Sequence, residues 1–102
     1  MKTINEKEII FNFLTRTLDH KYADLNAKAF IILYYVYIKK EVLSVRDYAR
    51  ILGTSRPHIT RLTDKLVFRH LIDKSCDKRD KRTVAIRPIN EREKAIKCIF
   101  NI

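Results

Sequence analysis

The stretch "SVRDYARILGTSRPHITRLTDKLVFRH", Ser44–His70, decides the fold of this chain of 102 residues. Ser44 can cap the N-terminus of a helix, and Asp47, three residues later, can complete a capping box. Apolar residues follow at helical spacing as far as Leu52. Gly53, the only glycine in the chain, comes next. A glycine directly after a helix predicts a residue of positive φ, so we expect the helix to end here.

A second helix is predicted to start directly after this glycine. Thr54 or Ser55 can cap it, and Pro57 falls in its first turn, where a missing N–H has no cost. The helix then continues to about His70. A short helix, a glycine turn and a longer helix make a helix-turn-helix.

The residues after the helix-turn-helix indicate a β-hairpin. Leu71–Cys76 and Thr83–Ile89 are β-like and mostly alternate between apolar and polar residues. Between them lies "DKRDKR", Asp77–Arg82, with four basic and two acidic residues. Charge runs are usually solvated, so this hexapeptide is expected at the tip of the hairpin. A hairpin that follows a helix-turn-helix in this way is a wing.

Two helices are predicted before Ser44. The first, Ile4–His20, is apolar over more than half of its circumference, which is typical of a helix with two packing partners: its own core and a second subunit. The second, Asn26–Glu41, is capped by Asn26 and is apolar all round its middle, so we expect it to be the central buried helix. A buried strand over Phe30–Ile38 is the alternative.

A short helix, Asn90–Phe100, is predicted to close the chain, with Asn90 as its cap. Four of its residues are expected to point inward: Ala95, Ile96, Ile99 and Phe100.

The predicted fold class is therefore mainly α with a small β-hairpin wing, a winged helix-turn-helix of about five helices. A chain of this length forms one domain, residues 1–102. Residues 1–41 and 90–102 are expected to support the core and a homodimer. The dimer contacts would come from the helix Ile4–Leu18 and from the C-terminal helix.

The charge of the chain is concentrated in its middle. The formal net charge is +10, and residues 42–90 hold 12 basic and 5 acidic residues, a net of +7. A clustered basic excess of this kind predicts a polyanionic partner, usually nucleic acid and sometimes an anionic membrane.

Other classes of function lack their sequence signals. Cys76 and Cys98 make no disulfide framework, and no spacing of His or Cys suits a metal, so no metal and no cofactor is expected. Paired carboxylates, nucleophile–base spacings and a Gly-rich phosphate loop are missing, which argues against an enzyme. The longest apolar run, Phe30–Ile38, is too short to span a bilayer, and the N-terminus does not resemble a signal peptide. We therefore expect a cytoplasmic protein.

The second helix of the helix-turn-helix has a polar face that suits DNA. Its apolar residues, Ile59, Leu62 and Leu66 with Val67 on the flank, determine which side is buried. The opposite side then carries Arg56, His58, Thr60, Arg61, Asp64 and Lys65. Arginine can donate two parallel hydrogen bonds to guanine in the major groove, and hydroxyls can bond phosphate or base edges. Ser55 is expected to cap the helix, which does not exclude a phosphate contact.

The stretch "TSRPHITRLTDKLVFRHLIDKSCDKRDKRTVAIRPINEREKAI" resembles the DNA-binding core of the MarR family of bacterial winged-helix transcription regulators. The matching features are the recognition helix "ITRLTDKL", the wing motif D-x-R-x-x-R (Asp77, Arg79, Arg82) and the return strand that ends in "INE". In size the chain is similar to the small staphylococcal accessory regulators.

The resemblance implies roles for individual residues. The major-groove readers would be Ser55, Arg56, His58, Thr60 and Arg61. Arg79 or Lys81 would reach the adjacent minor groove. Arg82 would be held inside the wing by acidic partners, for which Asp77 and Asp64 are the candidates.

The resemblance implies a sequence-specific regulator that binds double-stranded DNA as a homodimer at the bacterial nucleoid. Two alternatives remain. One is a winged-helix protein-interaction or assembly module, and the other is a replication-associated nucleic-acid binder, which would keep the basic face without the two-fold dimer.

Overall fold

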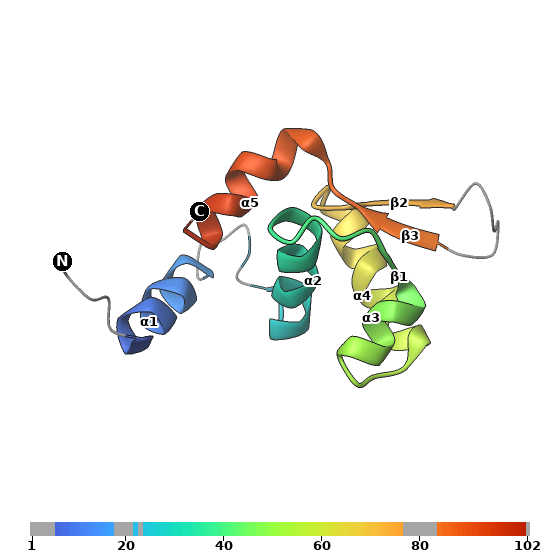
Figure 1. The fold of residues 1–102 in the computed structure, drawn as a ribbon, viewed down its shortest axis with the longest axis horizontal. Helices are drawn as coiled ribbons and strands as arrows, with labels where there is room; N and C mark the ends of the chain where they lie inside the picture. The colour runs from blue at the N-terminus through green and yellow to red at the C-terminus, as the bar shows by residue number, and fades with distance from the viewer. Residues whose placement is uncertain (1–5, 18–21, 23, 77–83, 102) are drawn as a thin grey trace.

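The computed structural model describes residues 6–17, 22, 24–76 and 84–101. Helix α2 (Ala27–Tyr37) stands at the centre of the molecule (Figure 1). On one side of it lie the helix-turn-helix and a small sheet, and on the other side lies α1 (Glu6–Thr17). The last helix, α5 (Glu93–Ile99), runs from the sheet towards α1. The predicted winged helix-turn-helix with five α-helices is confirmed for the described residues.

Helix α2 forms the centre of the core. Its N-terminus is capped by Asn26, whose side chain accepts a hydrogen bond from the backbone N of Ala29 at 2.9 Å. Most of its side chains are buried, which confirms a central helix and rules out the alternative strand. The helix ends at Tyr37 and not at Glu41, because the chain turns at Lys40, which has a φ of 56°.

The helix-turn-helix forms as predicted. Helix α3 (Val45–Ile51) starts with a capping box: Ser44 N donates to Asp47 Oδ2 at 3.0 Å, and Asp47 N donates to Ser44 Oγ at 3.2 Å. Gly53 has a φ of +63°, and a Cβ there would meet nothing within 4 Å, so glycine serves the backbone conformation and not a close approach. Helix α4 (Arg56–Phe68) follows, capped by Ser55.

The wing belongs to a three-stranded antiparallel sheet of order β1-β3-β2. Strands β2 (Asp73–Cys76) and β3 (Val84–Arg87) form the predicted hairpin, with Lys74 opposite Ile86. The third strand, β1 (Leu43–Ser44), pairs with β3 and was not expected. Two residues are too few to show an alternating pattern, so the pairing comes from the tertiary fold.

The buried core draws its residues from α2, α3, α4, β3 and α5, and α1 packs against it through Phe13. Helix α2 contributes Ile32, Leu33 and Val36, and residues of α3, α4, the sheet and α5 pack around them. Tyr37 crosses the core: its hydroxyl donates to Leu71 O and accepts from Ile89 N at 3.0 Å. One buried side chain therefore ties α2 to the exit of α4 and to the link between β3 and α5.

The C-terminal helix differs from its prediction at two positions. Residues Asn90–Arg92 form a short 3₁₀ helix before α5, and no side chain caps either helix, so Asn90 as a cap is wrong. Ala95 is exposed and not inward. Ile96 and Ile99 are buried as predicted, while Phe100 is half-buried.

Helix α1 has no buried residue. It touches the rest of the chain through Phe13, which packs against Phe30 and stacks on Phe100 with ring centroids 5.4 Å apart. Arg16 Nε also donates to Ile99 O at 2.8 Å, which satisfies a carbonyl at the end of α5. The predicted contact with its own core is confirmed. Residues 4 and 18, which the prediction included, lie outside the described residues.

Candidate nucleic-acid interface

Helix α4 divides into a buried apolar side and an exposed polar side. Ile59, Leu62 and Leu66 are buried, together with Thr63, whose hydroxyl donates to Ile59 O at 2.8 Å. The polar residues predicted for the opposite side are exposed: Arg56, Thr60, Arg61, Asp64 and Lys65. The predicted orientation of the helix is therefore correct.

Three arginines line a surface hollow between α3, α4 and β3. The hollow has a volume of about 490 Å³. Arg46 and Arg50 reach it from α3, Arg56 and Thr60 from α4, and Val84 closes it from β3. In the part of the chain that the structure describes, no ion pair holds any of the three guanidinium groups. The carboxylate of Asp47 lines the same hollow, and the charges of Arg50 and Arg46 add to the hydrogen bond from Ser44 N in lowering its pKa.

Ser55 and His58 belong to the start of α4. The Ser55 side chain accepts from His58 N at 3.3 Å, so its hydroxyl is used as the helix cap. His58 is half-buried, and its Nε2 is buried with no hydrogen-bond partner among the described residues. This nitrogen is not presented at the surface, which makes His58 less available than the arginines.

Lys65 has a protein partner near the far end of α4. Its Nζ donates to Asp24 O at 3.1 Å and lies 3.5 Å from Asp24 Oδ2. Arg69 binds the same carboxylate. The hydrogen bond from Arg69 holds the pKa of Asp24 below its ordinary value, and the charge of Lys65 adds to this effect. The two cations attach the C-terminal half of α4 to the segment before α2.

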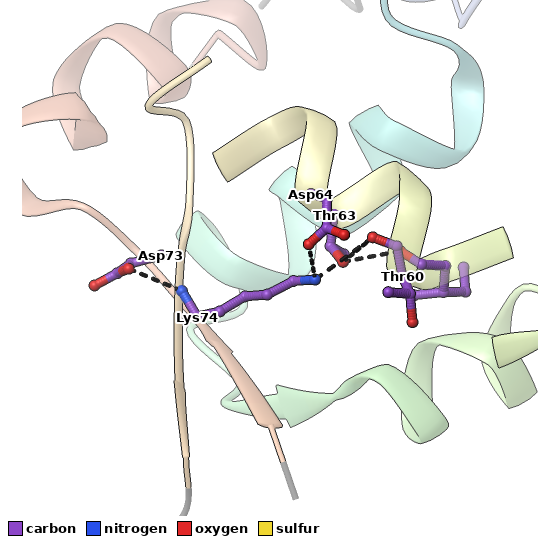
Figure 2. Close-up of polar contacts among 6 residues, drawn as sticks. Thr60, Thr63, Asp64, Asp73 and Lys74 are labelled. Atoms are coloured by element: carbon purple, nitrogen blue, oxygen red, sulfur yellow. Dashed lines mark hydrogen bonds and ion pairs between the residues drawn. The ribbon is translucent and has the colours of Figure 1, made fainter. Parts of the chain in front are cut away.

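Asp64 forms an ion pair with the wing. Its Oδ1 lies 2.6 Å from Nζ of Lys74 on β2 (Figure 2). Asp64 was predicted as a candidate partner of Arg82, and this stays a prediction because Arg82 lies outside the described residues; among the described residues the ion-pair partner of Asp64 is Lys74. The other predicted wing residues, Asp77, Arg79, Lys81 and Arg82, lie outside the described residues.

A comparison with protein families shows to which family the chain belongs. Residues 14–99 match the family described as "Transcriptional regulator SarA/Rot", which covers both the helix-turn-helix and the wing. The chain belongs to the SarA/Rot family. It is therefore a member of a family of transcriptional regulators, and its size agrees with the resemblance to small staphylococcal regulators.

Solved structures show the same fold for this SarA/Rot protein. MepR of S. aureus, in a complex with DNA, has a TM-score of 0.73 at 22% identity, and the match covers 93% of this chain and 78% of MepR. YusO of Bacillus subtilis has a TM-score of 0.70 at 17% identity, with 91% of this chain and 63% of YusO covered. Tm0710 of Thermotoga maritima has a TM-score of 0.73 at 18% identity, and the match covers 91% of this chain and 66% of Tm0710. The fold is the MarR-like winged helix, and the chain spans less than two thirds of YusO. No protein with a curated description matches it significantly.

Arg46 and Arg50 are the site residues that the sequence reasoning missed. They are four residues apart on α3, so they share one face of the helix. Tyr48 and Ala49 are buried on the other side of α3. The same periodicity that assigned the exposed face of α4 would have assigned this one.

A second uncovered surface of the SarA/Rot protein surrounds α1, and it is apolar. The exposed side chains on α1 include Ile9, Ile10, Phe11 and Leu14, and Phe11 retains 68% of its surface. A hollow of about 320 Å³ lies between α1, α2 and Phe100, and another of about 480 Å³ lies on the other side of Phe13. Exposed apolar patches are typical of surfaces that contact a protein, a membrane or a ligand.

Two structural features are absent from the described part of the chain. No group of three His, Cys, Asp or Glu residues there is placed to hold a metal ion. None of the described helices has the length and apolar character needed to cross a bilayer.

Proposed function

We propose that this protein is a sequence-specific transcriptional regulator that binds double-stranded DNA, with α4 in the major groove and the wing in the adjacent minor groove. The observation that carries the proposal is the exposed face of α4 beside the arginine-lined hollow. Arg56 and Arg61 are exposed, and Arg46 and Arg50 extend the positive surface onto α3. MepR, which has the same fold, was solved bound to DNA.

The residues divide into two roles. Arg61 and Thr60 lie on the outward side of α4, where base edges can be read. Arg46 and Arg50 lie beside the start of α4, where phosphate contacts position a helix in the groove. Arg56 lines the hollow and can serve either role.

The wing is proposed to supply the minor-groove contacts through Arg79 or Lys81, with Arg82 and Asp77 in supporting positions. This assignment follows from the MarR-like wing motif. It agrees with the position of β3, which supplies Val84 to the hollow beside α4.

The active form is proposed to be a homodimer through α1 and the C-terminal end of α5, with the 102 residues acting as one domain. The support is the apolar surface of α1, which its own chain leaves exposed. A two-fold dimer presents two recognition helices to two half-sites.

The test is the binding of a random-sequence DNA duplex, followed by fluorescence anisotropy at several salt concentrations. We expect log affinity to fall linearly with log salt, with a slope of about −0.9 per phosphate contact. A single-stranded probe of the same length serves as the control, and we expect it to bind more weakly. Absence of binding to the duplex at low salt would contradict the proposal and favour the interaction module. Preference for the single strand would favour the replication-associated binder.

A further inference from the structure

Lys74 is directed from the wing towards the recognition helix. It lies on β2, directly opposite Ile86 on β3. Opposed residues of an antiparallel pair have their side chains on the same side of the sheet. Ile86 is fully buried in the core, so the Lys74 side chain is also directed at the helices. Only 19% of the Lys74 side chain is exposed, against 64% for Asp64.

The ammonium group of Lys74 ends on two acceptors of α4. Its Nζ lies 2.6 Å from Asp64 Oδ1 and 3.5 Å from Thr60 O (Figure 2). The backbone N of Lys74 also donates to Asp73 Oδ1 at 2.9 Å. A single lysine therefore spans from the first half of β2 to the middle of α4.

Asp64 occupies an unfavourable place for a DNA-binding surface. It lies one helical turn beyond Thr60, on the stripe that begins with Arg56. A carboxylate on this side would repel phosphate. Asp64 is 64% exposed, so water screens its side of the pair, and thermal unfolding measures the contribution of the pair to stability separately from its effect on DNA binding.

We infer that Lys74 and Asp64 are a positioning pair, which holds the β2–β3 hairpin against α4 so that wing and recognition helix meet DNA in one fixed geometry. The inference rests on the proposed function. β2 leads directly into the basic hexapeptide 77–82, and β3 supplies Val84 to the arginine-lined hollow. Fixing these parts before binding reduces the conformational freedom that is lost on the DNA.

If the pair positions the hairpin, Asp64→Asn should change the DNA affinity in the direction opposite to that expected from charge alone. If the carboxylate only repelled DNA, its removal would strengthen binding. If it holds Lys74 and the hairpin in place, the same substitution weakens binding although the protein becomes more positive. A gain in DNA affinity would therefore indicate repulsion by Asp64, and a loss would indicate positioning of the hairpin.

The experiment measures binding of a random-sequence duplex to the full chain and to Asp64→Asn, Lys74→Met and Lys74→Arg, at several salt concentrations. The matched control is Glu93→Gln at the start of α5, which removes a carboxylate from an exposed pair with Lys40 (3.2 Å) that involves no residue of α4 or of the hairpin. Thermal unfolding by circular dichroism accompanies each binding curve.

We expect Asp64→Asn to bind roughly threefold to tenfold more weakly than Glu93→Gln, at an unchanged unfolding midpoint. Lys74→Met should lose affinity while its salt slope stays that of the wild type, because its charge serves Asp64 and not a phosphate. Lys74→Arg should retain binding, since arginine can keep the pair.

Two results would overturn the inference, and they differ. If Asp64→Asn binds as tightly as Glu93→Gln or more tightly, the pair does not position the wing, and the proposed function is unaffected. If the wild-type chain fails to bind duplex even at low salt, the proposed function fails and the inference fails with it.

Discussion

Helices α1 and α4 each leave one face uncovered, but the faces are of opposite character. Helix α4 buries its apolar residues Ile59, Leu62 and Leu66 within the chain and exposes a cationic side. Helix α1 buries none of its residues and exposes apolar ones, Phe11 and Leu14 among them. An open cationic face suits a polyanion, and an open apolar face suits another protein. The apolar face of α4 is covered within one chain, whereas the apolar face of α1 is left open and is proposed to pack against a second copy.

The largest difference between the two helices is expected in folding stability. Leu66→Ala on α4 leaves a cavity in the core and should lower the free energy of unfolding by about 2–5 kcal/mol. Leu14→Ala on α1, where the side chain is 55% exposed, should change the stability of the monomer by less than about 0.5 kcal/mol. Urea unfolding at low protein concentration measures both. A large loss for Leu14→Ala under these conditions would mean that α1 is part of the monomer core.

Self-association should respond in the opposite way. Phe11→Glu on α1 places a charge in the proposed dimer interface and should weaken dimerisation by about 2 kcal/mol or more. Phe68→Glu on α4 is the matched control, because Phe68 is 83% exposed and lies outside that interface. Sedimentation velocity over a range of concentrations measures the dimer dissociation constant. Equal effects of the two substitutions would contradict a dimer through α1.

Two buried tyrosines extend the comparison to the core between the two helices, because the hydroxyl of one is hydrogen-bonded and that of the other has no partner among the described residues. Tyr37→Phe removes the hydroxyl that bonds Leu71 O and Ile89 N, and should cost about 1–3 kcal/mol of stability. The Tyr48 hydroxyl is buried without a partner among the described residues, and burial raises its pKa. Tyr48→Phe should therefore leave the stability unchanged or raise it. Thermal unfolding distinguishes the pair, and a loss for Tyr48→Phe equal to that for Tyr37→Phe would refute the assignment.

The arginines of the cationic face should differ in their effect on DNA binding: one should set sequence discrimination and another the affinity for all sequences. Arg61→Ala should lose about 1–3 kcal/mol of discrimination between DNA sequences, because base contacts carry specificity. Arg50→Ala should weaken binding to all sequences about equally and reduce the salt slope by about one. The matched control is Arg92→Ala, at an exposed arginine in the 3₁₀ helix before α5. Competition binding with a selected and a random duplex measures both effects. The division is incorrect if Arg61→Ala weakens both duplexes alike.

Low pH should reduce the stability that the Asp47 capping box gives to the helix-turn-helix, but not the stability that the contacts of α1 provide. The hydrogen bond from Ser44 N holds the pKa of Asp47 below its ordinary value of 3.8. Its stabilisation is therefore present above about pH 4 and is lost as the pH falls through the lowered pKa. We expect the difference in unfolding free energy between wild type and Asp47→Asn to be constant from neutral pH to about pH 5 and to shrink below that. The contacts of Phe13 are neutral, so a Phe13→Leu variant should show no such trend.

The elements that could be predicted depend on local chemistry. Ser44, Asp47, Gly53 and Ser55 define the helix-turn-helix because caps and a positive φ act within a few residues. The arginines on α3 could also have been predicted, from the same helical spacing.

The features that were missed depend on contacts between distant segments. Strand β1 is too short to have a pattern of its own and exists because β3 lies beside it. Lys74 reaches Asp64 only because the hairpin folds back along α4. Asn90 looked like a helix cap, but the chain forms a 3₁₀ turn there before α5 begins. Each of these depends on where another element lies.

The bond between Arg16 and Ile99 has a consequence for synthesis of the chain. The two residues are 83 positions apart, so the ribosome makes α1 long before the part of α5 on which it docks. At ordinary rates of translation the interval is roughly 4–17 s. During this time α1 can contact Phe30 of α2 but not its docking site on α5, so most of its apolar side chains stay uncovered. The nascent chain is therefore most exposed to chaperones and to premature pairing with a neighbouring nascent copy through its first helix.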